Sequence, residues 1–149
     1  FDSYSLIRGI KTLSVRMDRQ LENTQKIIKF LQGHEGVAKV HYAGSQSEQE
    51  KALQEKQARG IGAVISIELA EGYNPTTFVK SLELFDLAVS LGGVESLVCQ
   101  PALMTHESYP VELQEAIGIT KGLLRLAIGI ENGDDLLNDL EQALDKAKK

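Results

Sequence analysis

The sequence predicts an α/β fold of two layers (α+β in arrangement), in which helices cover mainly one face of a small antiparallel or mixed sheet. Amphipathic helical stretches alternate with short, β-branched stretches typical of strands. Several connections are too short to hold a crossover helix between parallel neighbours. With 149 residues, 42% of them apolar, the chain is long enough for one domain with a real core.

The first element is predicted to be a long amphipathic helix within residues 1–33. Its apolar positions recur every three or four residues, with Thr24 filling the one gap, and Gly33 ends the pattern. These positions are Leu6, Ile10, Leu13, Met17, Leu21, Ile28 and Leu31. Since the chain starts inside a helical pattern without an initiator methionine, we expect it to be a piece of a longer protein.

The remaining elements follow from residue type and spacing. We expect strands at 37–42, 63–69, 87–90, 96–99 and 123–130, with a turn at Gly92-Gly93 between the third and the fourth. We expect helices at 45–59, from Pro75 to about Phe85, at 110–116 and from Gly133 to the end. The last helix carries an apolar stripe that should pack on the sheet, formed by Leu136, Leu140, Ala143, Leu144 and Ala147.

Composition excludes several classes of function. The net charge is −5, and the sixteen Lys and Arg do not form a basic block, so a nucleic-acid partner is not expected. The longest apolar runs are strand-sized, which argues against a membrane partner. The single cysteine, Cys99, excludes an intrachain disulfide, and with no leader peptide this predicts a cytoplasmic protein.

Most motif-like features have an ordinary structural explanation. His34-Glu35 and His106-Glu107 begin like a zinc-protease motif, but neither is followed by the second histidine, so we expect no metal site. Gly60-Ile61-Gly62 precedes a strand and is interpreted as a turn, not as a dinucleotide-binding loop. Cys99 is interpreted as a small buried side chain and not as a nucleophile.

Arg125 is the exception, because it interrupts an otherwise apolar predicted strand. A guanidinium keeps its charge, so on a buried strand it needs an anionic or strongly accepting partner. Residue chemistry leaves two partners open: an internal acid, such as Glu95, Glu131 or one on the last helix, or a ligand carboxylate held by a bidentate pair. Ser90 ends a predicted strand just before two glycines, where backbone and hydroxyl can approach a ligand.

A set of motifs in register covers essentially the whole chain and resembles one family. The segments are 8–13, 90–97, 104–106, 118–120 and 124–131. In order and spacing they resemble the C-terminal domain of the pyridoxal-phosphate (PLP) enzymes of cysteine and methionine metabolism: cystathionine γ-synthase, cystathionine β- and γ-lyases, and methionine γ-lyase. The implied fold is the small C-terminal domain of a fold-type I PLP enzyme, comprising residues 1–149.

The resemblance assigns a substrate site. Arg125 corresponds to the arginine that holds the α-carboxylate of an amino-acid substrate, Ser90 assists it, and Thr105 lies near the same pocket. Val89 stands where relatives that prefer cystathionine in a γ-replacement or γ-elimination often carry glutamate. An apolar residue there suits a sulfur amino acid with an uncharged side chain, and Val89 with Leu91 would shape the side-chain pocket. This favours a C–S lyase over a synthase. Such a lyase would perform β- or γ-elimination on a sulfur amino acid of the cystathionine, methionine or homocysteine type.

The resemblance also implies what lies elsewhere. The family binds PLP through a lysine of a large N-terminal domain, and no lysine here has that setting, so we expect no catalytic or cofactor-binding residue in this chain and no activity from it alone. Expected partners are that large domain, the substrate and, in a homotetrameric parent, further subunits. Two other functions stay open. The chain could be a stand-alone amino-acid-binding or regulatory module without catalysis, or Arg125 could have a purely structural role in an internal salt bridge.

Overall fold

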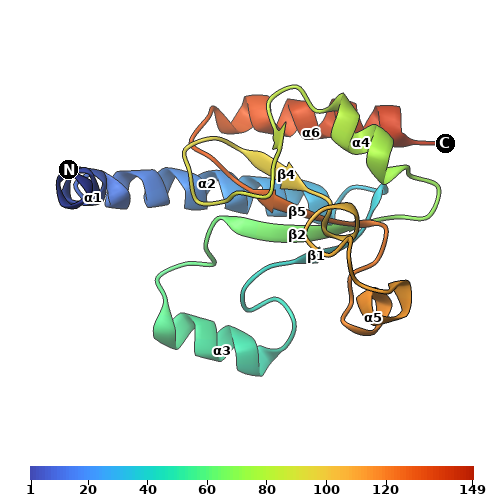
Figure 1. Ribbon diagram of the computed structural model, residues 1–149, viewed down its shortest axis with the longest axis horizontal. Coiled ribbons are helices and arrows are strands. Elements are labelled where there is room, and N and C mark those ends of the chain that lie inside the picture. Colours follow the sequence, from blue (N-terminus) through green and yellow to red (C-terminus); the bar gives the residue numbers. More distant parts are fainter.

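Five short strands form one mixed sheet in the order β1-β2-β5-β4-β3 (Figure 1). The computed structural model describes residues 1–149. The strands are β1 (Val37–His41), β2 (Val64–Leu69), β3 (Asp86–Leu87), β4 (Leu97–Cys99) and β5 (Leu123–Ala127). Neighbours pair antiparallel except β3 and β4, which are parallel. The prediction of an α/β fold with a small mixed sheet is therefore confirmed.

The helices that pack on the sheet lie on one face of it (Figure 1). The helical elements are α1 (Asp2–Ile10), α2 (Leu13–Gln32), α3 (Glu48–Gln57), α4 (Pro75–Ser81), the 3₁₀ helix η1 (Pro101–Leu103), α5 (Val111–Ala116) and α6 (Gly133–Ala147). α2, α4 and α6 supply the helical part of the core, whereas α3 and α5 lie outside this layer. None of the helices combines the length and apolar character needed to cross a membrane.

The core forms where alternate strand residues meet the apolar stripes of these helices. Ile65 and Ile67 of β2 and Leu124 and Leu126 of β5 are almost fully buried, because successive strand residues point to opposite faces. Burying a side chain of this size stabilises the fold by roughly 1.5–3 kcal/mol. The predicted α6 stripe is buried in full, as Leu136, Leu140, Ala143, Leu144 and Ala147.

The predicted single helix of the first 33 residues is divided in two at Lys11 and Thr12. The carbonyl of Gly9 accepts hydrogen bonds from Thr12 Oγ1 at 3.4 Å and from Arg16 Nη2 at 3.1 Å. Glycine is a weak helix former, so these side-chain donors suffice to interrupt the backbone hydrogen bonds of the helix at this point. α1 buries no side chain and lies at the far end of α2, beyond the sheet (Figure 1).

The segment between β3 and β4 also differs from the prediction. β3 is two residues long and runs parallel to β4, so Gly92 and Gly93 belong to a longer connection and not to a hairpin turn. We call this connection, residues 88–96, the 88–96 loop. β5 ends at Ala127, three residues before the predicted boundary.

A buried carboxylate explains why α4 ends at Ser81 and not near Phe85. Asp139 of α6 accepts the backbone N–H groups of Glu83, Leu84 and Phe85 at 2.8, 2.9 and 3.3 Å. These N–H groups therefore bond to a side chain instead of continuing the helix. A charged acceptor with several donors is the form in which a buried carboxylate is stabilised.

We therefore expect Asp139→Ala to lower the free energy of unfolding by about 1–3 kcal/mol, because three backbone donors lose their acceptor. Urea denaturation followed by circular dichroism measures this loss. Asp145→Ala is the matched control, since Asp145 is an exposed acid of the same helix. Equal stability of the two variants would show that Asp139 does not fix this turn.

Candidate functional site

Arg125 lies on the open face of the sheet, opposite the core helices. In the ladder it is paired with Ser66 of β2 on one side and with Cys99 of β4 on the other. Its strand neighbours Leu124 and Leu126 point into the core, so alternation directs Arg125 to the other face. The arginine is half-buried, which leaves its charge partly removed from water.

The guanidinium is held by backbone carbonyls and not by acids. Nη2 donates to the carbonyl oxygen of Val89 at 2.6 Å and to that of Ser90 at 3.2 Å. Nε is buried and makes no hydrogen bond. Arg125 takes part in none of the salt bridges of the chain. The guanidinium of Arg125 is therefore oriented and still has N–H donors without an acceptor.

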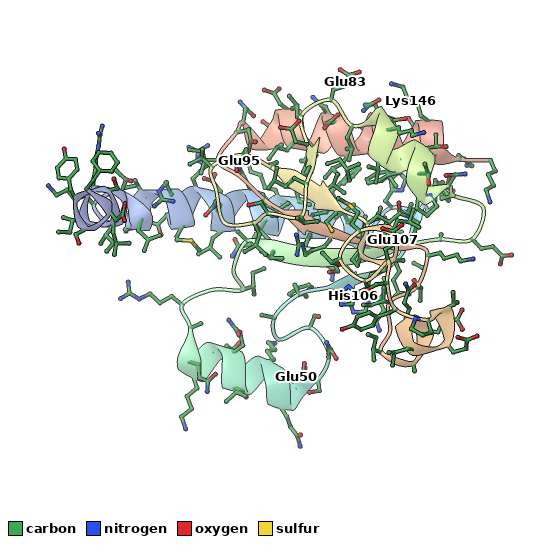
Figure 2. The ribbon with its side chains drawn as sticks, in the orientation of Figure 1. Glu50, Glu83, Glu95, His106, Glu107 and Lys146 are labelled. Atoms are coloured by element: carbon green, nitrogen blue, oxygen red, sulfur yellow. The ribbon has the colours of Figure 1, made fainter.

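The acids that could have paired with Arg125 have other partners or lie elsewhere. Glu131 accepts from the backbone N–H of Ser96 at 2.6 Å and from its Oγ at 2.9 Å. Asp139 of the last helix accepts the backbone N–H groups described above. Glu95 lies exposed on the 88–96 loop (Figure 2). The internal ion pair is thus not present in the structure.

A cavity of about 290 Å³ lies beside Arg125. Its polar walls include Ser66 and His41 of the sheet and, on the side of α3, Glu50 (Figure 2). His41 Nε2 lies 2.7 Å from Glu68 Oε1, so its ring is held in place. Sequence reasoning did not find Ser66 and His41; the alternation of polar and apolar residues along β2 is the signal that could have found Ser66.

Of the predicted substrate-site residues, the structure joins Val89 and Ser90 to Arg125. Both contact it through their carbonyl oxygens, while the side chain of Val89 is 53% exposed. Leu91, next along the loop, is also exposed and makes no hydrogen bond to Arg125. Thr105 lies exposed in the turn between η1 and α5, and no hydrogen bond joins it to Arg125.

Cys99 is a buried free thiol, as predicted. Burial raises the pKa of this thiol, and the positive charge of Arg125 acts in the opposite direction but more weakly. A thiol that keeps its proton is a poor nucleophile. The cysteine therefore fits a packing role beside Arg125.

The two His-Glu pairs have local contacts. His34 Nδ1 accepts the backbone N–H of Gly36 at 3.0 Å, and His106 Nδ1 lies 2.8 Å from Thr105 Oγ1. His106 lies with Glu107 in the turn before α5 (Figure 2). No group of three or more His, Cys, Asp or Glu side chains is close enough to hold a metal ion.

The lysines of this chain are surface residues. All of them are exposed. A hydrogen bond from Lys148 to Glu35 raises the pKa of that lysine, which favours the protonated amine. A Schiff-base lysine needs the opposite setting, in which desolvation or a neighbouring cation favours the neutral amine. Lys148 therefore has the opposite setting to the one that a Schiff base requires.

Comparison with known proteins gives consistent matches along the whole chain. Residues 1–145 match the family model described as Cys/Met metabolism PLP-dependent enzyme. A cystathionine β-lyase of Lactococcus lactis subsp. cremoris is 48% identical over 145 residues, which cover 97% of this chain and 38% of the relative. An L-methionine γ-lyase of Fusobacterium nucleatum subsp. polymorphum is 44% identical over 146 residues, 97% of this chain and 37% of the relative.

Solved structures give the same result. A crystal structure of cystathionine γ-lyase from Lactobacillus plantarum, complexed with L-serine, superposes with a TM-score of 0.88 at 44% identity; the match covers 94% of this chain and 37% of that one. The chain thus spans less than two fifths of the length of these relatives. By the match to the family model and these similarities, the chain belongs to the PLP-dependent enzymes of cysteine and methionine metabolism.

Proposed function

We propose that this chain is the C-terminal, small domain of a PLP-dependent C–S lyase, and that Arg125 holds the α-carboxylate of a sulfur amino-acid substrate. The parent enzyme would perform β- or γ-elimination on a substrate of the cystathionine or methionine type. Relatives named as cystathionine β-lyase, cystathionine γ-lyase and methionine γ-lyase support this class of substrate. The share of their length that this chain covers supports its role as one domain.

The observation that carries the proposal is the uncompensated charge of Arg125. The carbonyls of Val89 and Ser90 orient the guanidinium, but they carry no net charge. A carboxylate supplies both the missing charge and acceptors for the remaining donors, in the planar, bidentate geometry that a guanidinium favours. Of the common groups on an amino-acid substrate, the α-carboxylate fits this site best.

The residues that flank Arg125 support the choice of a lyase. Val89 presents an exposed apolar side chain at the point where the backbone meets the guanidinium. An apolar surface there suits a substrate with an uncharged side chain, and Leu91 extends it. Ser90 and Thr105 would supply hydroxyl groups at the edge of the site.

The cofactor belongs, in this proposal, to the rest of the parent enzyme. The exposed lysines of this chain do not suit a Schiff base, and we place the PLP-binding lysine in a large N-terminal domain. When bound there, PLP supplies the electron sink for elimination. The part of this chain is to bind and orient the carboxylate, so the chain alone is inactive. We place the parent, a homotetramer as in the family it resembles, in the cytoplasm.

In the parent enzyme, Arg125→Ala should raise KM for the sulfur amino acid by about 10- to 100-fold, because a charge-assisted pair to the substrate is lost. Steady-state kinetics measure the change. Arg59→Ala is the control, since Arg59 is an exposed arginine on another loop and should leave KM unchanged. An unchanged KM in Arg125→Ala would refute the carboxylate site.

The cavity beside Arg125 favours one alternative, a binding module that captures amino acids without chemistry. Calorimetry of this chain with methionine or cystathionine separates the two functions. We expect no measurable heat of binding, because the proposed site is completed only by the large domain. Binding that is lost in Arg125→Ala would instead support the module.

A further inference from the structure

The 88–96 loop contacts both Arg125 and helix α2. At its start, Arg125 bonds to the carbonyls of Val89 and Ser90. Further along the same loop, Gln20 Nε2 of α2 donates to the carbonyl of Gly93 at 2.8 Å. Helix α2 therefore contacts the loop that orients the guanidinium, 73 residues away in sequence.

Gln20 is buried to an extent that is unusual for glutamine. Only 2% of it is exposed, whereas most of its neighbours at the start of α2 are exposed. A buried amide requires a hydrogen-bond partner, and the Gly93 carbonyl provides it. Because the amide of Gln20 is buried, it has no ready access to water as an alternative partner, and the bond holds the loop carbonyl at a defined position.

A second amide on the same helix holds the segment that follows β5. Asn23, which is 1% exposed, donates through Nδ2 to the carbonyls of Gly129 and Glu131 at 3.1 and 3.0 Å. These residues follow the end of β5, the strand that carries Arg125. Gln20 and Asn23 thus hold α2 against the 88–96 loop and against the segment that follows β5.

The far end of the loop is fixed separately. Glu131 accepts from the N–H and the hydroxyl of Ser96, whose Oγ in turn accepts the N–H of Gly129 at 2.9 Å. The side-chain bond that holds the middle of the loop is therefore the one from Gln20. The backbone N–H of Ile130 also donates to the carbonyl of Val94, at 2.9 Å. Loss of the bond from Gln20 should therefore free the stretch from Gly93 back to Val89 and Ser90, while Val94 and Ser96 stay in place.

From this arrangement we propose that Gln20 is a positioning residue for the substrate carboxylate site. By holding the Gly93 carbonyl it fixes the 88–96 loop, and through the carbonyls of Val89 and Ser90 the loop orients Arg125. The proposal rests on the proposed role of Arg125 as the carboxylate-binding residue. It adds that the fit of the substrate carboxylate depends on the position of α2.

The test is Gln20→Met in the full-length parent enzyme, which keeps the volume but removes the donor. We expect KM to rise about three- to tenfold, the usual effect of one neutral hydrogen bond, with kcat within about twofold. Gln142→Met is the matched control, because Gln142 Nε2 also donates to a backbone carbonyl, that of Ser81 at 2.6 Å at the end of α4. This control should leave KM unchanged.

A double-mutant cycle distinguishes positioning from a general effect on folding. If Gln20 acts through Arg125, Gln20→Met should have no further effect on KM in the Arg125→Ala background. Gln20→Leu removes the same donor and replaces the methionine variant if that variant does not fold.

Three results would overturn the inference: an unchanged KM in the folded Gln20 variant, the same increase in Gln142→Met, or equal effects with and without Arg125. If Arg125→Ala itself leaves KM unchanged, the proposed function fails first and on separate grounds.

Discussion

The permanent charge of Arg125 is the constraint on which the open face of the sheet depends. A guanidinium on a half-buried strand must be either paired or solvated, and this one is held by two neutral carbonyls. Both carbonyls belong to the 88–96 loop, which begins just after the short strand β3. The orientation of the guanidinium therefore depends on the position of this loop.

Buried and half-buried polar side chains, more than regular secondary structure, hold the connections around this site. Asp139 holds the turn before β3, Gln20 holds the middle of the 88–96 loop, and Glu131 holds its end. Each bonds to backbone groups that no helix or strand satisfies. The apolar core supplies the platform of sheet and helices, while these polar contacts determine where the site residues lie on it.

The sequence predicts those parts that depend on local pattern. The alternation in β2, the stripe of α6 and the buried Cys99 follow from periodicity or composition, and the motifs that surround Arg125 indicate its family. The end of α4, the division at Thr12 and the parallel pairing of β3 could not be predicted in this way. The end of α4 depends on Asp139, more than 50 residues distant, and the pairing of β3 on the backbone bonds it shares with β4. The Val89 and Ser90 carbonyls are likewise acceptors that no side-chain pattern reveals.

The most direct test of this account is a crystal structure of the full-length parent enzyme with a bound sulfur amino acid or a carboxylate-bearing analogue. The account predicts that the α-carboxylate lies within hydrogen-bond distance, about 2.7–3.2 Å, of the guanidinium of Arg125, with the contacts to Val89 and Ser90 retained. A carboxylate bound elsewhere, with Arg125 paired to an acid from the rest of the parent, would contradict it.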